Sequence, residues 1–319
     1  MKLSQAMLHE AATVVQAVVP ATPQRRWPLL EQRVGCELWV KHENHAPTGA
    51  FKVRGGITYV RSLLHREPSV RGVLAATRGN HGQSVAFAAA RAGLPAVVVV
   101  PHGNSREKNA AMRAFGAELV EHGQDFQEAF EYASRLAEER GLHFISSFDQ
   151  GLIVGVATYA LELFTAVPDL DAVYVPIGMG SGICGVIAAR DALGIRARVI
   201  GVVSEVLPSY QLSFEQGAPV STPPAATIAD GLACRVPNPE AVAAIRAGAD
   251  RVVAVGEAAI RDAMRYYFTD THNVIEGAGA APLAAVLAER DAVRGKRVAV
   301  VASGGNVDAA VFAQVLQGD

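Results

Sequence analysis

The feature that most constrains the fold is an alternation of short valine-rich runs with longer alanine-rich stretches. The short runs are apolar rather than alternating, which is typical of parallel strands buried on both faces. The predicted strands are Val73–Thr77, Ala96–Pro101, Glu118–Glu121, His143–Ser146, Ala172–Pro176, Val199–Val203, Val252–Val255 and Val298–Ala302. The predicted helices are Gln83–Ala92, Ser105–Phe115, Asp125–Arg140, Gly182–Leu193 and Glu257–Phe268. This order predicts an α/β fold with open, mostly parallel sheets and flanking helices.

The chain has 319 residues, enough for one large domain or two ordinary ones. Residues 71–146 hold four of the predicted strands and can form a small domain of their own. Residues 1–70 and 147–319 then form the large domain, into which the small one is inserted. At the N-terminus we expect an amphipathic helix rather than a signal peptide, because His9 and Glu10 interrupt its apolar residues.

The composition argues against several classes of protein. The formal net charge is −2 and the basic residues are scattered, which disfavours binding to nucleic acid or to an anionic membrane. No apolar run reaches the roughly 18 residues of a membrane-spanning helix. The three cysteines form no CxxC pair, so neither a disulfide framework nor a zinc site is expected. We therefore expect a cytoplasmic protein that acts on a small molecule.

Lys52 is the first candidate for chemistry. It lies in the segment Thr48-Gly-Ala-Phe-Lys-Val-Arg-Gly-Gly56, among small residues just before a helix. Such a lysine can be a solvated residue at a helix start. Alternatively it is a Schiff-base lysine, since an amine nucleophile needs a partly desolvated pocket that lowers its pKa. Phe51 and Val53 could then supply the apolar wall of that pocket.

A glycine-rich loop, Ile177-Gly-Met-Gly-Ser-Gly-Ile-Cys-Gly185, follows a predicted strand and opens a helix. Glycines let the backbone approach an anion closely, and the free N–H groups of a helix N-terminus point at it. The loop is no Walker A motif, because no Gly-Lys-Ser/Thr follows. It also fits a weak dinucleotide fingerprint, for which Glu205 is the nearest acid. Taken alone, the loop leaves a mononucleotide-like phosphate and a dinucleotide open.

Two more polar segments stand at strand ends, where ligands bind in open α/β sheets. Thr77-Arg-Gly-Asn-His-Gly-Gln83 is either a turn capped by Asn80 or a cradle for a carboxylate or cofactor, built from backbone N–H groups and Asn80. In Ala302-Ser-Gly-Gly-Asn-Val-Asp308, Ser303 either caps the next turn or hydrogen-bonds a ring nitrogen. Each segment alone leaves both readings open.

In this order, the four segments resemble the serine/threonine dehydratase (ammonia-lyase) family of fold-type II pyridoxal 5′-phosphate (PLP) enzymes, which includes serine racemase. The resemblance runs from Thr22 to Val315. It implies a large PLP-binding domain with a smaller inserted domain, an amino-acid substrate and a homodimer or larger homo-oligomer. It also implies the reaction, the loss of water from a β-hydroxy-α-amino acid followed by hydrolysis of the product to a 2-oxo acid and ammonia.

The resemblance also assigns roles to single residues. Lys52 is implied to bind PLP and to take the Cα proton, and Phe51 to lie beside the ring. Asn80 is implied to contact the 3′-oxygen of PLP and Ser303 the pyridine nitrogen, while Glu276 is an acid near the cofactor. The implied phosphate loop consists of Gly178, Met179, Gly180, Ser181 and Gly182. The implied loop for the substrate carboxylate consists of Thr77, Arg78, Gly79, Asn80 and His81. A family-like Ala-Asp-Gly segment ends at Gly231.

The chain departs from the family pattern at two places that affect function. Arg78 stands where the racemases place the serine that protonates the opposite face, which argues against racemisation as the main activity. Arg78 instead extends the carboxylate site or points to solvent. Glu205 is shifted from the carboxylate that binds a divalent cation in relatives, so it is a weak candidate ligand. A monovalent cation held mainly by carbonyl groups is the remaining option.

The preferred substrate stays open at the level of the sequence. Threonine or serine is the default, 3-phenylserine is a bulkier alternative, and 3-hydroxyaspartate is another if Arg78 faces the pocket. A β-replacement enzyme of the cysteine synthase or cystathionine synthase type is disfavoured, because those relatives usually carry Thr where this chain has His81. A non-catalytic PLP carrier is disfavoured because Lys52, Asn80 and Ser303 are all present.

Overall fold

Two separate sheets organise the computed structural model, which describes residues 3–318. The larger sheet has the strand order β1-β2-β10-β7-β8-β9 and the smaller one β5-β4-β3-β6. Neighbouring strands are parallel except for β1, which pairs antiparallel with β2 at one edge. The strands are β1 (Gln24–Arg26), β2 (Glu37–His42), β3 (Val73–Ala76), β4 (Ala96–Val100), β5 (Glu118–Glu121), β6 (His143–Phe144), β7 (Ala172–Pro176), β8 (Arg198–Ser204), β9 (Arg251–Val255) and β10 (Arg297–Ala302).

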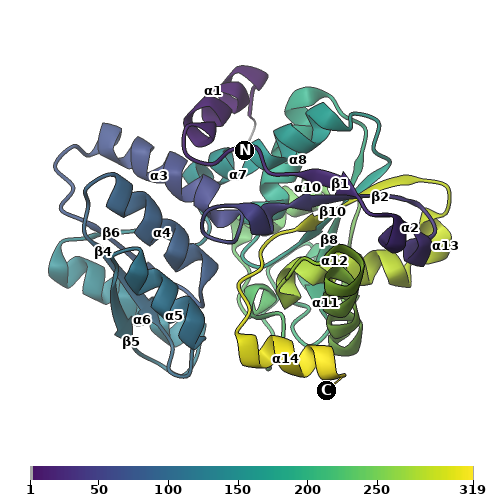
Figure 1. Ribbon diagram of the computed structural model, residues 1–319. Helices are drawn as coiled ribbons and strands as arrows, with labels where there is room; N and C mark the ends of the chain where they lie inside the picture. Colours follow the sequence, from purple (N-terminus) through teal and green to yellow (C-terminus); the bar gives the residue numbers. More distant parts are fainter. Residues whose placement is uncertain (1–2, 319) are drawn as a thin grey trace.

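Helices flank both sheets, and Figure 1 shows the two resulting lobes. The α-helices are α1 (Gln5–Gln16), α2 (Pro28–Val34), α3 (Lys52–Arg66), α4 (Asn80–Arg91), α5 (Arg106–Ala114), α6 (Phe126–Arg140), α7 (Gln150–Ala166), α8 (Ser181–Leu193), α9 (Ser209–Gln216), α10 (Pro239–Gly248), α11 (Glu257–Thr271), α12 (Gly277–Ala288), α13 (Arg290–Val293) and α14 (Ala309–Gln317). The 3-10 helices are η1 (Glu43–His45) and η2 (Asp230–Leu232). Among residues 3–318, no helix combines the length and the apolar character that a membrane crossing requires.

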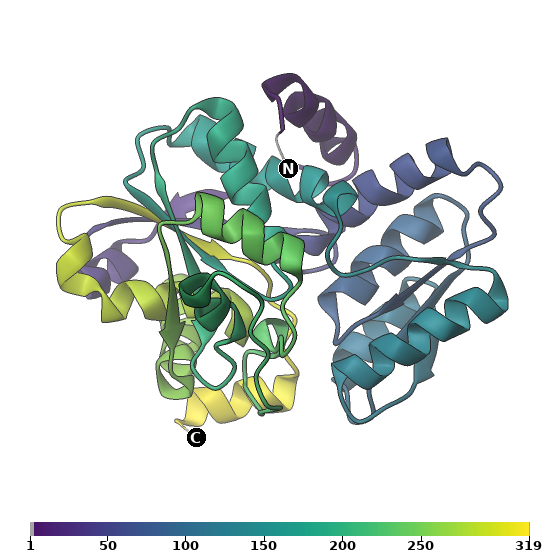
Figure 2. The same cartoon turned by 180° about the vertical axis from the view of Figure 1, so that it is seen from behind.

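Each sheet is buried on both faces, as the apolar strands predict. In β7, Val173 and Val175 pack with α7 and α8 on one side, while Tyr174 packs with α11 and α12 on the other. In the smaller sheet, one face packs against α3 and α4 and the opposite face against α6. Figure 2 shows α6 lying across this second face, seen from behind. The alternation of side chains along each strand thus fills two cores at once.

The predicted fold class is confirmed, and all the predicted strands are present with small shifts at their ends. The predicted N-terminal helix is present as α1. The sequence analysis missed β1 and β2. Strand β1 is short and mostly exposed, and β2 ends in the buried polar residues Lys41 and His42, which interrupt its apolar pattern. The smaller sheet lies within residues 71–146, while the domain boundaries themselves stay a prediction.

Candidate active site

A cavity lies between the two sheets, where the loops that follow β3, β7 and β10 meet. In parallel sheets these carboxyl ends are the usual place for ligands. The small-sheet lobe lines the cavity with Thr77, Arg78, Gly79, Asn80, His81, Lys108, Phe126 and Ser147. The other lining residues include Phe51, Lys52, Gly178, Met179, Gly180, Ser181, Gly182, Asp230, Gly231, Leu232, Ala233, Cys234, Glu276 and Ser303. Residues from distant parts of the sequence, predicted separately, therefore meet in one place.

Lys52 is the first residue of α3, and its side chain is held inside the cavity. Its Nζ donates a hydrogen bond to Ser181 Oγ at 2.8 Å. Burial lowers the pKa of Lys52 to about 8, which raises the fraction of neutral, nucleophilic amine. The centroid of the Phe51 ring lies 5.1 Å from Lys52 Nζ. The expectation that Val53 helps to wall the pocket is wrong, because Val53 packs with a separate apolar cluster that includes Val15.

The glycine-rich loop joins β7 to α8 and leaves the N-terminus of α8 without a side-chain cap. Gly180 is the cap residue and has φ 100°, a left-handed conformation that favours glycine. The Tyr210 hydroxyl donates to Met179 O at 2.9 Å, and the Tyr159 hydroxyl donates to Gly182 O at 3.2 Å. The loop is thus fixed from outside, while the first amides of α8 have no intrahelical partner. This arrangement suits a bound anion.

Asn80 does not cap α4, although a turn capped by Asn80 was one of the two interpretations that the sequence allowed. Helix α4 begins at Asn80 itself and is preceded by Gly79, which supplies no side-chain cap. The Asn80 Nδ2 atom donates to Glu276 Oε1 at 2.6 Å, and Asn80 Oδ1 accepts from Asn306 Nδ2 at 2.8 Å. Both ends of the amide are therefore assigned, and one N–H hydrogen remains for a ligand.

Two side chains of the proposed carboxylate loop are used to build the loop itself. Thr77 Oγ1 accepts hydrogen bonds from the backbone N–H of Gly79 at 2.9 Å and of Gly82 at 3.3 Å. Burial lowers the pKa of His81 to about 4, so its neutral ring donates from Nε2 to Ile145 O at 3.1 Å. The imidazole is structural, which leaves backbone N–H groups for a substrate carboxylate.

Arg78 lines the cavity and is half-buried. Within the described residues, 3–318, its guanidinium has no hydrogen-bonding or ion-pair partner from another side chain. A cation in this position is available to an anionic group of a ligand.

A family model described as pyridoxal-phosphate dependent enzyme matches residues 15–304. The chain belongs to this family. L-threonine ammonia-lyase of Thermotoga maritima is 37% identical over 97% of this chain and 77% of its own length. Threonine deaminase isoform 2 from Solanum lycopersicum, in its processed form, is 29% identical with a TM-score of 0.88, covering 99% of this chain and 94% of its own. Maize serine racemase is 28% identical with a TM-score of 0.91, covering 100% of this chain and 98% of its own. The PLP enzyme described here thus belongs to the serine/threonine dehydratase group of the family.

The cavity of this PLP enzyme fits the cofactor that its family uses. The uncapped N-terminus of α8 suits a phosphate dianion. The buried amine of Lys52, with its lowered pKa, suits an aldehyde. Ser303 is 4% exposed and lines the cavity, and none of the side chains in residues 3–318 hydrogen-bonds its hydroxyl. The donor set therefore matches the phosphate, the aldehyde and the ring nitrogen of PLP.

Gly178 gives a direct test of the phosphate loop. A Cβ atom at this position would lie 2.3 Å from Gly231 O, so Gly178→Ala must displace the loop. We expect the variant to bind PLP about tenfold more weakly, a loss of roughly 1.4 kcal/mol. Titration of the apo-protein with PLP measures this change. Gly194→Ala is the control for local strain: Gly194 has φ 66° at the far end of α8, but a Cβ there meets nothing within 4 Å, so PLP affinity should not change. Wild-type affinity in Gly178→Ala would contradict the assignment.

Lys108 is a cavity residue that the sequence analysis missed. It lies on α5, and its Nζ is 2.6 Å from Asp230 Oδ2 and 3.2 Å from Glu276 Oε2. In the sequence it follows Arg106 and Glu107, so it looks like part of a solvated helix face. The sequence feature that could have pointed to Lys108 is its ion-pair partner Asp230, which stands directly before Gly231 in the family-like Ala-Asp-Gly segment.

Glu205, the weak candidate for a cation ligand, lies outside the cavity. It follows β8 and is exposed. The part of the chain that the structure describes brings together no three His, Cys, Asp or Glu side chains that could hold a metal ion. Both Glu205 as a ligand and a monovalent cation stay predictions.

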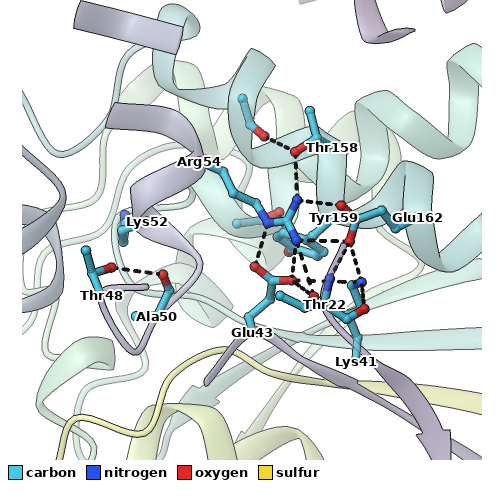
Figure 3. A network of polar contacts seen from close by, with 12 residues as sticks. Thr22, Lys41, Glu43, Thr48, Ala50, Lys52, Arg54, Thr158, Tyr159 and Glu162 are labelled. Atoms are coloured by element: carbon cyan, nitrogen blue, oxygen red, sulfur yellow. Dashed lines mark hydrogen bonds and ion pairs between the residues drawn. The ribbon is translucent and has the colours of Figure 1, made fainter. Parts of the chain in front are cut away.

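A buried ion network lies behind the turn that carries Lys52, as Figure 3 shows. Arg54 donates to Glu43 Oε2 at 2.8 Å and to Glu162 Oε1 at 2.7 Å. Lys41 Nζ lies 2.6 Å from Glu162 Oε2. The two cations balance the two carboxylates, and the side chains of Arg54, Lys41 and Glu43 are fully buried. The network ties the first turn of α3 to η1 and α7.

Proposed function

We propose that this enzyme eliminates water from a β-hydroxy-α-amino acid of the serine and threonine type. The enamine product tautomerises to an imine, which water hydrolyses to a 2-oxo acid and ammonia. The observation that carries the proposal is the amine of Lys52 beside the uncapped N-terminus of α8, in one cavity with Asn80 and Ser303. The relatives named L-threonine ammonia-lyase support the same reaction. A homo-oligomer, expected from the sequence, stays a prediction.

The protein residues have separate tasks in this reaction. When bound, PLP supplies an electron sink for the bond changes at the substrate Cα. The amine of Lys52 would hold the cofactor, and as a free amine it would take the Cα proton of the substrate at Nζ. The backbone N–H groups of residues 79–81 hold the substrate carboxylate. Phe51 lies beside the ring, and the first amides of α8 hold the phosphate.

Ser303 sets the electronic character of the site. Its hydroxyl is the group proposed to face the pyridine nitrogen. A hydroxyl cannot keep that nitrogen protonated as a carboxylate would, because it carries no negative charge. Charge build-up at Cα is then less favoured, and prompt loss of the β-substituent is more favoured. This supports elimination over racemisation, in line with Arg78 at the position of the racemase serine.

A second compartment adjoins the cavity and offers space for a bulky substrate side chain. The two share Arg78, Phe126, Met179, Ala233 and Cys234. The further walls of the second compartment include Phe130, Leu207, Pro224, Val236 and Pro237. Apolar and aromatic walls favour an apolar group larger than the methyl of threonine. We therefore propose L-threo-3-phenylserine as a substrate beside threonine and serine.

A second candidate is 3-hydroxyaspartate, and Arg78 favours it. Arg78 lines both compartments, and its guanidinium has no side-chain partner within residues 3–318. It could pair with a carboxylate on the substrate β-carbon. In that case Arg78→Ala would lower kcat/KM for hydroxyaspartate far more than for phenylserine.

Turnover of a substrate panel by the PLP-loaded enzyme tests these proposals. We expect 2-oxo acid from L-threonine, L-serine and L-threo-3-phenylserine. We expect Ala233→Leu to lower kcat/KM for phenylserine about tenfold or more, because it narrows the junction of the two compartments. Serine turnover in the same variant is the internal control. Equal losses for both substrates would contradict the bulky-substrate proposal. Bound PLP without any 2-oxo acid, but with consumption of a thiol, would point to β-replacement instead.

A further inference from the structure

Lys108 is a buried charge whose role none of the proposed steps explains. Its side chain is 6% exposed and lies between the carboxylates of Asp230 and Glu276. Burial alone would lower the pKa of Lys108, but the two carboxylates outweigh it and hold the pKa above its usual value. Lys108 is therefore a permanent ammonium ion in the cavity and cannot serve as a base.

The backbone leaves room for this lysine and its partner. A Cβ at Gly79 would lie 2.3 Å from Lys108 Cδ, so the lysine stem passes directly over this glycine. A Cβ at Gly304 would lie 2.5 Å from Glu276 Oε1 and 3.3 Å from Asn80 Nδ2. Glycines from two of the four motif segments thus keep open the space for Lys108, Glu276 and Asn80.

These three side chains form a continuous line of contacts. Lys108 Nζ lies 3.2 Å from Glu276 Oε2, and Glu276 Oε1 accepts from Asn80 Nδ2 at 2.6 Å. An ionised carboxylate can only accept hydrogen bonds, so it selects the N–H end of the Asn80 amide. A protonated Glu276 could also donate, and it would then accept either end of the amide. An ionised Glu276 therefore selects the same orientation of the Asn80 amide that Asn306 Nδ2 selects by donating to Asn80 Oδ1 at 2.8 Å.

We propose that Lys108 is a positioning residue that favours the ionised form of Glu276 and thereby, together with Asn306, holds the Asn80 amide that contacts the 3′-oxygen of PLP. The inference rests on the proposed contact of Asn80 with the cofactor. Lys108 belongs to α5 beside the small sheet, whereas Glu276 precedes α12 beside the large sheet. The contact with the cofactor consequently depends on the two lobes meeting.

The pH dependence expected for a Lys108 variant follows from the groups around Glu276. The pKa of Glu276 lies above its usual value, because burial and the nearby Asp230 raise it more than Lys108 lowers it. Lys52 and Arg78 line the same cavity in every variant. Removing the ammonium raises the pKa of Glu276 further, so the carboxyl takes up its proton at a higher pH. Cofactor binding by the variant should therefore weaken more than that of the wild type as the pH falls.

Cofactor affinity, measured by titrating apo-protein with PLP at several pH values, tests the inference. We expect Lys108→Met to weaken PLP binding about tenfold at the acidic end of the range and less at the alkaline end. Lys108→Arg keeps the charge and should stay within a few-fold of the wild type. Lys296→Met, directly before β10 and at the opposite end of that strand from Ser303, should leave the affinity unchanged.

A double variant separates positioning from a general structural role. In a Glu276→Gln background position 276 has no carboxyl that can titrate, so Lys108→Met should cause little further loss of PLP affinity. A loss that is independent of pH and equal in both backgrounds would overturn the proposal. If Lys108→Met does not fold, the single variant Glu276→Gln tests the inference. It should weaken PLP binding several-fold, and an unchanged affinity for PLP would overturn the inference. Absence of PLP binding in the wild type would instead refute the cofactor site itself.

Discussion

Lys52→Ala is expected to lower kcat for 2-oxo acid release by at least about 10³-fold, because one side chain supplies both the cofactor attachment and the base. The buried amine lies 2.8 Å from Ser181 Oγ, and its pKa, lowered to about 8, raises the fraction of neutral amine near neutral pH. Lys108, the other lysine that lines the cavity, is held as an ammonium ion by its two carboxylates. It cannot replace the lost base.

Steady-state release of 2-oxo acid from the best panel substrate measures the effect. The visible absorbance band of lysine-bound PLP should disappear in the same variant, while PLP added to it still binds without a covalent link. Ser181→Ala is the matched variant: it removes the hydrogen bond to Nζ but keeps the amine, and it should lose far less activity. Full turnover by Lys52→Ala would refute the catalytic assignment.

The sequence predicts that several of these motifs lie close together, because most of them follow strands. Lys52, the Gly178–Gly182 loop and Ser303 each belong to a short motif whose neighbours already suggest a turn, a helix start or a strand end. The carboxyl ends of parallel strands share one edge, so motifs that follow different strands converge. The pattern of strands and helices therefore predicts both the fold class and the meeting point of these motifs.

Other features could not be predicted because they depend on packing between elements distant in the sequence. Lys108 stands in a charged helical segment, and only the approach of the two lobes buries it against Glu276. Val53 was wrongly predicted to line the cavity. It neighbours Lys52 in sequence but faces away from it on α3. Asn80 could equally cap a helix, and its contact with Glu276 spans nearly two hundred residues.

The same limit applies to the buried network around Arg54. Lys41, Glu43, Arg54 and Glu162 are charged residues that a sequence pattern assigns to the surface. In the fold each charge has an opposite partner, and Figure 3 shows the guanidinium of Arg54 between the two carboxylates. Arg54 lies two residues after Lys52, in the first turn of α3. The network therefore supports the turn that places the catalytic amine.

Arg54→Met is expected to lower the free energy of unfolding by about 3–5 kcal/mol, since it leaves two buried carboxylates with the single cation Lys41. Urea unfolding, followed by the fluorescence of Trp27 and Trp39, measures the change. Arg61→Met is the matched control, because Arg61 lies on the same helix but is exposed. It should change the free energy by less than about 0.5 kcal/mol.

The pH dependence of this loss identifies its electrostatic cause. In the wild type, burial would raise the pKa of Glu162, but Arg54 and Lys41 outweigh it and hold the pKa below its usual value. Glu162 therefore stabilises the native state above its unfolded pKa, and this contribution disappears as the pH falls through its folded pKa. Without Arg54 the carboxyl pKa should lie above the unfolded value, so acid should favour the folded variant. The difference between wild type and Arg54→Met should shrink from neutral to mildly acidic pH, whereas lost packing alone would give the same difference at both.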